Sequence, residues 1–103
     1  MLLITRVRIV GPSMAPTMLN GEWWVVRRGS NVSPGDVALV VHPDRPDLLI
    51  VKRLVRRENG GWWVLGDNPD ASEDSRQFGV VPDGNVLGRL WWRYHPIRRS
   101  TAG

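Results

Sequence analysis

Cysteine is absent from this 103-residue sequence, and lysine occurs once beside thirteen arginines. The missing thiols exclude disulfide bonds, thiol nucleophiles, iron–sulfur clusters and thiolate zinc sites. Long apolar runs are also missing, because Arg6 and Arg8 interrupt the apolar start of the chain, whereas a membrane-spanning helix needs roughly 20 apolar residues. No small-residue cleavage site of a signal peptide follows. We therefore expect a soluble, cytoplasmic protein whose membrane contact, if any, is peripheral.

The length suits one compact domain, which we place at residues 1–96, followed by a flexible tail at residues 97–103. The formal net charge is +4, a sign that would suit an anionic partner. The arginines, however, stand in scattered pairs, without the helical stripe or the aromatic pattern of RNA-binding proteins. We therefore expect no nucleic-acid partner.

Short β-rich runs separated by turn residues indicate an all-β domain, since no stretch shows the apolar period of a helix. The pair Asn59-Gly60 is the strongest hairpin signal, because both residues tolerate positive φ. We expect a small coiled antiparallel-sheet barrel with little helix, and a polar, irregular loop at 67–77. Its strands are predicted near Leu3–Val10, Glu22–Arg27, Val37–His42, Leu48–Arg57, Gly61–Leu65 and Val86–Tyr94.

Tryptophan occurs only as adjacent pairs, namely Trp23 and Trp24, Trp62 and Trp63, and Trp91 and Trp92. Neighbours in a strand point to opposite faces of the sheet, so one member of each pair can fill the core. The other member must be covered by a loop, contact a partner or remain exposed. Core packing is the first interpretation, and an outer apolar patch for substrate or a membrane surface is the second.

The single lysine, Lys52, lies in an apolar run, and strand alternation places Ile50 and Leu54 on its face. Where only positive charge is needed this chain uses arginine, so a lone lysine here points to a group that must lose its proton. Burial can lower a lysine pKa from about 10.4 by about 3–5 units, into the range of a general base. The alternative is an edge-strand lysine whose tip reaches water.

Two further segments carry candidate polar groups. Gly11–Met18 is a turn-rich loop whose prolines limit backbone freedom, so it can hold the Ser13 hydroxyl close to a base, while Gly11 leaves room for a substrate chain. Gly66–Arg76 is a dense polar loop in which a serine can orient an amine and an Asp–Arg pair can fix the backbone. Each is also readable as an ordinary turn or a solvated acidic loop, and the spacing requires no metal.

Taken in order, these segments resemble the motifs of the type I signal peptidases. The matching stretches are Ser13–Thr17, Gly35-Asp36-Val37, Lys52-Arg53, Gly66–Arg76 and, at the closing strand, Gly88-Arg89. The resemblance implies the β-sheet catalytic core that this family shares with LexA-type repressors. It also implies a serine endopeptidase with a Ser/Lys dyad and with no cofactor or metal.

By this resemblance, Ser13 attacks the scissile carbonyl, Lys52 takes its proton, Ser72 holds the lysine amine, and Asp74 with Arg76 braces the loop. The oxyanion and substrate loop would comprise Gly11, Ser13, Met14 and Pro16. The Ser13 N–H would donate to the oxyanion, whereas Pro12 has no N–H to offer. Gram-negative members carry a serine as second donor where Gly11 stands here, so the resemblance leaves that donor open.

The segments Arg45–Leu49, Val51–Arg53 and Gly60–Trp63 further resemble a small soluble branch of the family from actinobacteria, the maturation proteases of nickel-type superoxide dismutase. The implied substrate is a precursor protein that loses an N-terminal extension. Three alternatives remain: general processing of secretory preproteins, a self-cleaving LexA-type domain, and a non-catalytic β-barrel that binds a peptide or a membrane. A self-cleaving repressor fits less well, because no DNA-binding region or cleavable linker precedes the domain.

A histidine-based triad is a weaker hypothesis, because His42 and His95 each precede a proline in expected loop or tail sequence. We expect both at the surface. Two histidines are also too few to propose a nickel site.

Overall fold

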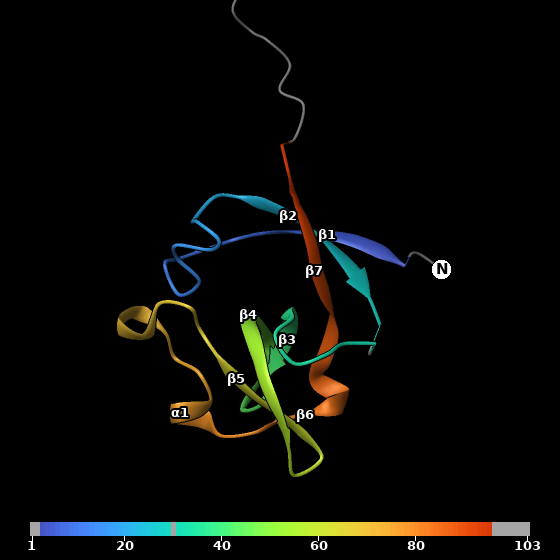
Figure 1. The fold of residues 1–103 in the computed structure, drawn as a ribbon, viewed down its shortest axis with the longest axis vertical. Helices are drawn as coiled ribbons and strands as arrows, with labels where there is room; N and C mark the ends of the chain where they lie inside the picture. Colours follow the sequence, from blue (N-terminus) through green and yellow to red (C-terminus); the bar gives the residue numbers. More distant parts are fainter. Residues whose placement is uncertain (1–2, 30, 96–103) are drawn as a thin grey trace, which may run out of the picture.

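The computed structural model describes residues 3–29 and 31–95, and its seven strands form one antiparallel sheet in the order β1-β2-β7-β3-β4-β5-β6. β1 and β2 lie at one end of the molecule, and β5, β6 and α1 lie at the other (Figure 1). The predicted all-β, antiparallel architecture with little helix is confirmed. The elements are β1 (Ile4–Arg8), β2 (Trp23–Arg28), β3 (Val37–His42), β4 (Arg45–Glu58), β5 (Gly61–Leu65), η1 (Pro69–Ala71), α1 (Ser75–Phe78), β6 (Val81–Pro82), η2 (Asp83–Asn85) and β7 (Val86–Tyr94).

Strand boundaries differ from the prediction mainly in β4 and β6. β4 begins at Arg45 rather than Leu48, because its first residue pairs with His42 of β3 across a register shift. β6 has only two residues, too few to leave an alternating pattern in the sequence. The predicted irregular loop at 67–77 contains η1 and the start of α1. The predicted tail at residues 97–103 lies outside the described residues.

The predicted Asn59-Gly60 turn joins β4 to β5 in a hairpin. Asn59 has φ of 48° and Gly60 has φ of 77°, and the flanking Glu58 and Gly61 pair across the turn. Positive φ at both central residues matches the right-handed twist of the two strands. The hairpin fixes β5 beside the strand that carries Lys52.

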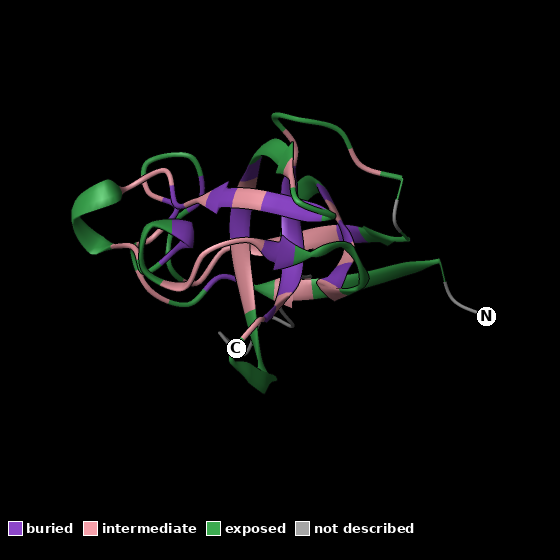
Figure 2. Cartoon of the chain, turned by 90° about the horizontal axis from the view of Figure 1, so that it is seen from below, coloured by how far each residue is buried: buried purple, intermediate pink, exposed green. Residues whose placement is uncertain are grey.

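The core divides into two clusters that share β3. Val37 and Leu39 belong to the first cluster and Ala38 and Val40 to the second, because alternate residues of a strand face opposite sides. Figure 2 shows the buried residues concentrated on the central strands. The first cluster comprises Ile9, Met14, Met18, Val26, Val37, Leu39 and Leu90, and the second Ala38, Val40, Leu54, Trp62, Val64, Val81 and Val86.

The tryptophan pairs follow the prediction in two cases and break it in the third. Trp62 is fully buried, and Trp24 packs half-buried against the first cluster. Trp91 and Trp92 are both exposed, at 41% and 46%, so the expectation of one core member is wrong for this pair.

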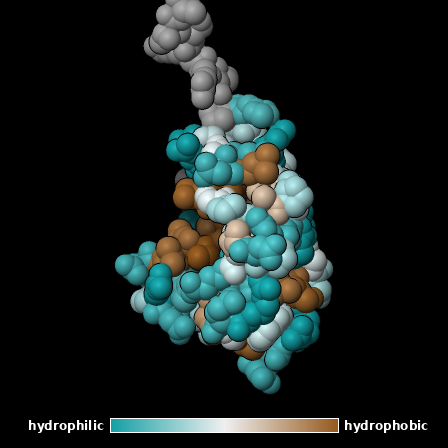
Figure 3. Space-filling view, turned by 90° about the vertical axis from the view of Figure 1, so that its left-hand side faces the viewer, coloured by the Kyte–Doolittle hydropathy of each residue, from teal (hydrophilic) through white to brown (hydrophobic). Residues whose placement is uncertain are grey.

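A β-bulge explains the exposed pair. Val25 of β2 faces Trp92, whereas the next residue, Val26, faces Leu90, so Trp91 has no opposite partner. Because of this shift, the side chain that points into the core is that of Leu90, which is 6% exposed, and not that of a tryptophan. Apolar side chains are also exposed elsewhere, and Figure 3 shows such residues grouped between hydrophilic ones on one side of the molecule.

Candidate active site

Lys52 is buried in the middle of the sheet. It lies on β4 between β3 and β5, opposite Ala38, and only 4% of it is exposed. As predicted, Ile50 and Leu54 share its face, and both belong to or pack against the second cluster. The alternative of an edge-strand lysine with its tip in water therefore does not hold.

The Lys52 amine donates a hydrogen bond to Ser72 Oγ at 3.1 Å. Burial lowers the pKa of Lys52 from its ordinary value, because desolvation penalises the ammonium form. The carboxylates of Asp74 and Glu73 oppose this effect, and the Arg76 guanidinium adds to it. The net direction is downward, which is the direction that a lysine general base requires.

Ser72 links the amine to a buried carboxylate. Its hydroxyl accepts from Lys52 and donates to Asp74 Oδ2 at 3.0 Å. Because the hydroxyl proton is committed to Asp74, the oxygen presents a lone pair to the amine. The predicted role of Ser72 as the group that holds the lysine has this contact in its favour.

Asp74 is fully buried and braced by Arg76, which donates to it through Nε at 2.9 Å and Nη2 at 3.0 Å. Burial alone would raise the pKa of Asp74. Hydrogen bonds from the Arg76 guanidinium, the Gly66 and Arg76 backbone N–H groups and the Ser72 hydroxyl outweigh that effect and lower the pKa to about 2. The carboxylate is therefore ionised at neutral pH and acts only as an acceptor.

The same aspartate begins α1. Asp74 accepts the Arg76 N–H, and the Gln77 side chain accepts the Asp74 N–H at 2.8 Å, which together form a capping box. Ser75 Oγ accepts the Val64 N–H of β5 at 2.8 Å. The turn that carries Ser72 is thus joined to β5 through Ser75 and capped by Asp74 at the start of α1, so it is not a free solvated loop.

The Ser13 loop lies against this turn. Ser13 O accepts the Asn68 N–H at 2.9 Å, and the Asn68 side chain donates to Pro12 O at 3.1 Å. A Cβ added to Gly66 would collide with both Ser72 Oγ and Ser13 O, so these two atoms flank the same glycine. The fold therefore brings Ser13, Ser72 and Lys52 to one place, although no hydrogen bond joins Ser13 Oγ to Lys52 among the described residues.

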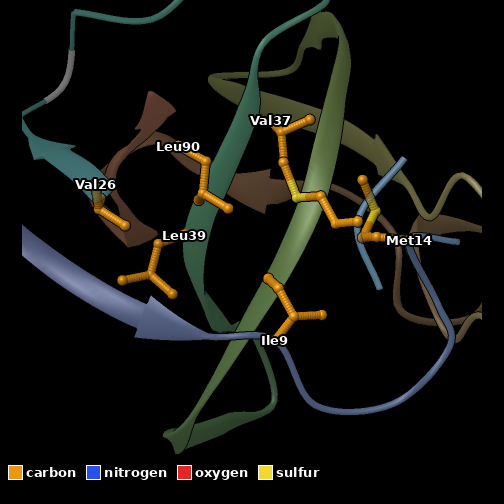
Figure 4. Packing of buried hydrophobic residues seen from close by; sticks show 7 residues of the cluster. Ile9, Met14, Val26, Val37, Leu39 and Leu90 are labelled. Carbon is orange, nitrogen blue, oxygen red and sulfur yellow. The ribbon is translucent and has the colours of Figure 1, made fainter. Parts of the chain in front are cut away.

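Met14 fastens the Ser13 loop to the core. It is 1% exposed and lies in the first cluster with Ile9 and Val37 (Figure 4). Pro16, in the same loop, is exposed. The Gly11 N–H donates to Asn20 Oδ1 at 2.9 Å, so that donor is already used, whereas the Ser13 N–H forms no hydrogen bond within the described residues.

A clamp that the sequence interpretation missed ties the two loops to β4. Arg53, next to Lys52, donates to both oxygens of Asp67 at 2.8 and 2.7 Å and to Gly35 O at 2.7 Å. Thr17 donates to the same Asp67 at 2.6 Å. The hydrogen bonds from Arg53 keep the pKa of Asp67 below its ordinary value. The arginine in Lys52-Arg53 and the aspartate in Gly66-Asp67 were the available signals.

The expectation that both histidines lie at the surface is wrong for His42. His42 ends β3 and is 4% exposed, because its ring packs against Phe78 with ring centroids 4.7 Å apart and the planes tilted by 56°. Its Nε2 lies 3.3 Å from Glu73 Oε1. His95 is exposed, as expected. Neither histidine contacts the Ser13 loop in the described hydrogen bonds, which gives a histidine triad no support.

Over residues 3–29 and 31–95, no group of three potential metal-ligating side chains is assembled. No helix within the same residues is long and apolar enough to cross a membrane.

Comparison with protein families matches residues 4–83 to the family described as peptidase S24-like. Mitochondrial inner membrane protease subunit 1 of Xenopus tropicalis is 31% identical over a match that covers 84% of this chain and 66% of that protein. Mitochondrial ATP-independent inner membrane protease subunit 1a of Arabidopsis thaliana is 32% identical, with coverage of 86% and 71%. A shorter stretch, 37% of this chain and 20% of the relative, is 40% identical to signal peptidase IB of Staphylococcus aureus. The chain thus spans about two thirds of the length of the mitochondrial relatives.

Proposed function

Because the chain belongs to the peptidase S24-like family, we propose that it is a serine endopeptidase in which Ser13 is the nucleophile and Lys52 the general base. One observation carries the proposal. The only lysine of the chain is buried, its pKa is lowered, and it is held by Ser72 beside the loop that bears Ser13. These are the features that a lysine general base needs, because its amine must lose its proton and be held in place.

The proposed chemistry uses both sides of the neutral amine. One N–H is donated to Ser72 Oγ, so the nitrogen lone pair is available to take the proton of the Ser13 hydroxyl. Ser13 Oγ then attacks the scissile carbonyl, and the Ser13 N–H donates to the oxyanion that forms. The Lys52 ammonium returns the proton to the leaving amine, and the neutral amine next activates the water that hydrolyses the acyl-enzyme.

For the substrate we propose a precursor protein that loses an N-terminal extension, specifically the precursor of a nickel-type superoxide dismutase. The likeness of Arg45–Leu49, Val51–Arg53 and Gly60–Trp63 to the actinobacterial maturation proteases supports this choice. Processing of secretory preproteins is the alternative, and the similarity to signal peptidase IB favours it.

The test is cleavage of both kinds of precursor by purified protein, with the new N-terminus identified by mass spectrometry. Ser13→Ala and Lys52→Met should each abolish cleavage, and Ser33→Ala, a change at an exposed serine outside the site, should not. Cleavage of the dismutase precursor alone supports the maturation role. Cleavage of the secretory preprotein alone removes that role and keeps the dyad, whereas activity that survives Lys52→Met removes the dyad.

We also propose that Trp91 and Trp92 let the protein contact a membrane surface peripherally. Both rings are exposed, they lie 4.3 Å apart, and the Arg27 guanidinium lies 5.9 Å from the Trp91 ring. Aromatic rings beside cations suit the headgroup region of anionic bilayers. Co-sedimentation with anionic vesicles should be lost in the double variant Trp91→Ser, Trp92→Ser. Full recovery of the wild type in the supernatant would contradict this proposal.

A further inference from the structure

A buried histidine lies beneath the turn that carries Ser72, and the proposed chemistry gives it no task. His42 occupies the last position of β3, on the same row as Ala38 and Val40, and Ala38 faces Lys52 across the β3–β4 pairing. The ring is covered by Phe78 of α1. The imidazole therefore lies on the same face of the sheet as Lys52.

The two ring nitrogens of His42 have different partners. Nδ1 accepts the Asp44 N–H at 3.0 Å, so in the neutral ring the proton resides on Nε2. Nε2 lies 3.3 Å from Glu73 Oε1 and donates to it. The Asp44 contact thus fixes the tautomer that can hold a carboxylate.

In the sequence, Glu73 lies between Ser72 and Asp74, the two residues of the hydrogen-bond chain that starts at the Lys52 amine. Asp74 is held by Arg76 and by the Gly66 N–H, all on the side of β5 and α1. Glu73 points the other way, toward β3, and His42 is its hydrogen-bond partner there. The turn is therefore fixed from two sides, and on the β3 side the described residues form a single hydrogen bond to it, that of His42 with Glu73.

We propose that His42 is a positioning residue for the base: by holding Glu73 it fixes the turn that presents Ser72 to Lys52, and it keeps a second carboxylate near that amine. The inference rests on the proposed Ser/Lys chemistry. Among the described residues, His42 forms no hydrogen bond to the nucleophile loop or to the amine, and its one hydrogen bond to the turn is the contact with Glu73.

The charged groups that act on the Lys52 amine are Asp74, Glu73 and Arg76. Both carboxylates favour the ammonium form, and burial and the arginine disfavour it. Glu73 is the more exposed of the two carboxylates, at 57% against 0% for Asp74, so its position is the one that a weak contact can change. Through Glu73, His42 therefore controls the part of the electric field at the Lys52 amine that the Asp74–Arg76 pair does not fix.

The single lysine allows a direct measurement. Protein labelled with 13C-lysine gives one side-chain ε signal, that of Lys52, and its shift follows both the pKa of the amine and its surroundings. Ser72→Ala gives the reference signal for an amine without its hydroxyl partner. This readout needs no substrate, so it is independent of whether the protein cleaves anything.

Two substitutions at one position separate the two contacts of the ring. His42→Asn keeps an acceptor for the Asp44 N–H and cannot reach Glu73, whereas His42→Gln keeps a donor at the place of Nε2. We expect His42→Asn to move the Lys52 signal toward that of Ser72→Ala and to lower kcat roughly 10- to 100-fold with KM little changed. His42→Gln should restore much of both. Glu73→Gln, which keeps an acceptor but removes the charge, should lower the pKa of Lys52.

Glu58→Gln is the matched control, because this carboxylate is the last residue of β4 and pairs with Arg56. It should leave the Lys52 signal and kcat at wild-type values. A wild-type Lys52 signal and kcat in His42→Asn would overturn the proposal, and so would equal loss in His42→Asn and His42→Gln. Absence of all protease activity in the wild type would instead remove the proposed chemistry, while the Lys52 signal would still decide whether His42 positions the turn.

Discussion

The Ser72 hydroxyl accepts a hydrogen bond from the Lys52 amine at 3.1 Å and donates one to the Asp74 carboxylate at 3.0 Å. The amine is thereby oriented by a group that is itself oriented by an ionised, buried carboxylate. This chain of contacts runs from β4 through the turn before α1 and ends on the arginine of α1. Loss of each residue in this chain should change kcat or stability in a different way, so substitutions can separate their contributions.

Ser72→Ala removes the contact to the amine without opening a large cavity. We expect kcat to fall roughly 10- to 100-fold with KM little changed, because the amine loses its orientation while the substrate contacts remain. Steady-state kinetics on the cleaved precursor checks this. Ser33→Ala is the control, and a wild-type kcat in Ser72→Ala would show that the Lys52–Ser72 contact is not used.

Asp74→Asn replaces a carboxylate whose pKa is about 2 in the fold and 3.8 ordinarily. Because the folded-state pKa is the lower one, the carboxylate stabilises the fold above pH 3.8, and that contribution is lost as pH falls toward 2. We expect the variant to lose about 2 kcal/mol in urea unfolding at pH 7. The difference from wild type should shrink at pH 2, and a pH-independent difference would assign the loss to packing.

Lys52→Met tests the cost of burying the amine. The folded-state pKa of Lys52 lies below its unfolded value, so the unfolded chain binds more protons between the two and wild-type stability rises with pH across that window. Methionine has similar length and no charge. We therefore expect the variant to be more stable than wild type at acidic pH, with the gap closing toward pH of about 10.4. Equal pH dependence of unfolding in both proteins would contradict the lowered pKa.

Gly66→Ala tests the close approach of the two loops. The added methyl would meet Ser72 Oγ and the Ser13 carbonyl, one of which is backbone and cannot rotate away. We expect a loss of about 1–3 kcal/mol in stability and a fall in kcat, measured by urea unfolding and cleavage. Gly84→Ala is the matched control, since a Cβ there meets nothing within 4 Å. A neutral Gly66→Ala would mean that the loops separate readily.

The parts of the fold that follow local rules were predictable from the sequence. The alternation around Lys52 gave its face and its apolar neighbours, and Asn59-Gly60 gave the hairpin. The order of the motifs, and not geometry, predicted the roles of Ser72, Asp74 and Arg76. This prediction has now gained contacts within hydrogen-bonding distance.

The features that were missed depend on pairing between distant segments. The bulge that exposes Trp91 inserts one residue against β2 and reverses the alternation, which no single strand reveals. His42 is buried because Phe78 covers it, and its partner Glu73 lies 31 residues further along the chain. Arg53 and Asp67 were noted only as parts of the sequence motifs, because their bidentate pairing depends on the β4–β5 hairpin that brings them together.

β3 supplies side chains to both core clusters, so neither cluster can open while the other stays intact. Unfolding should then be cooperative across the whole sheet. A protease that opened in halves would offer its own loose strands to other copies of itself. A strand shared by both halves should make such partly open forms rare, which would protect a chain with the proposed peptidase activity from cleavage by its own copies.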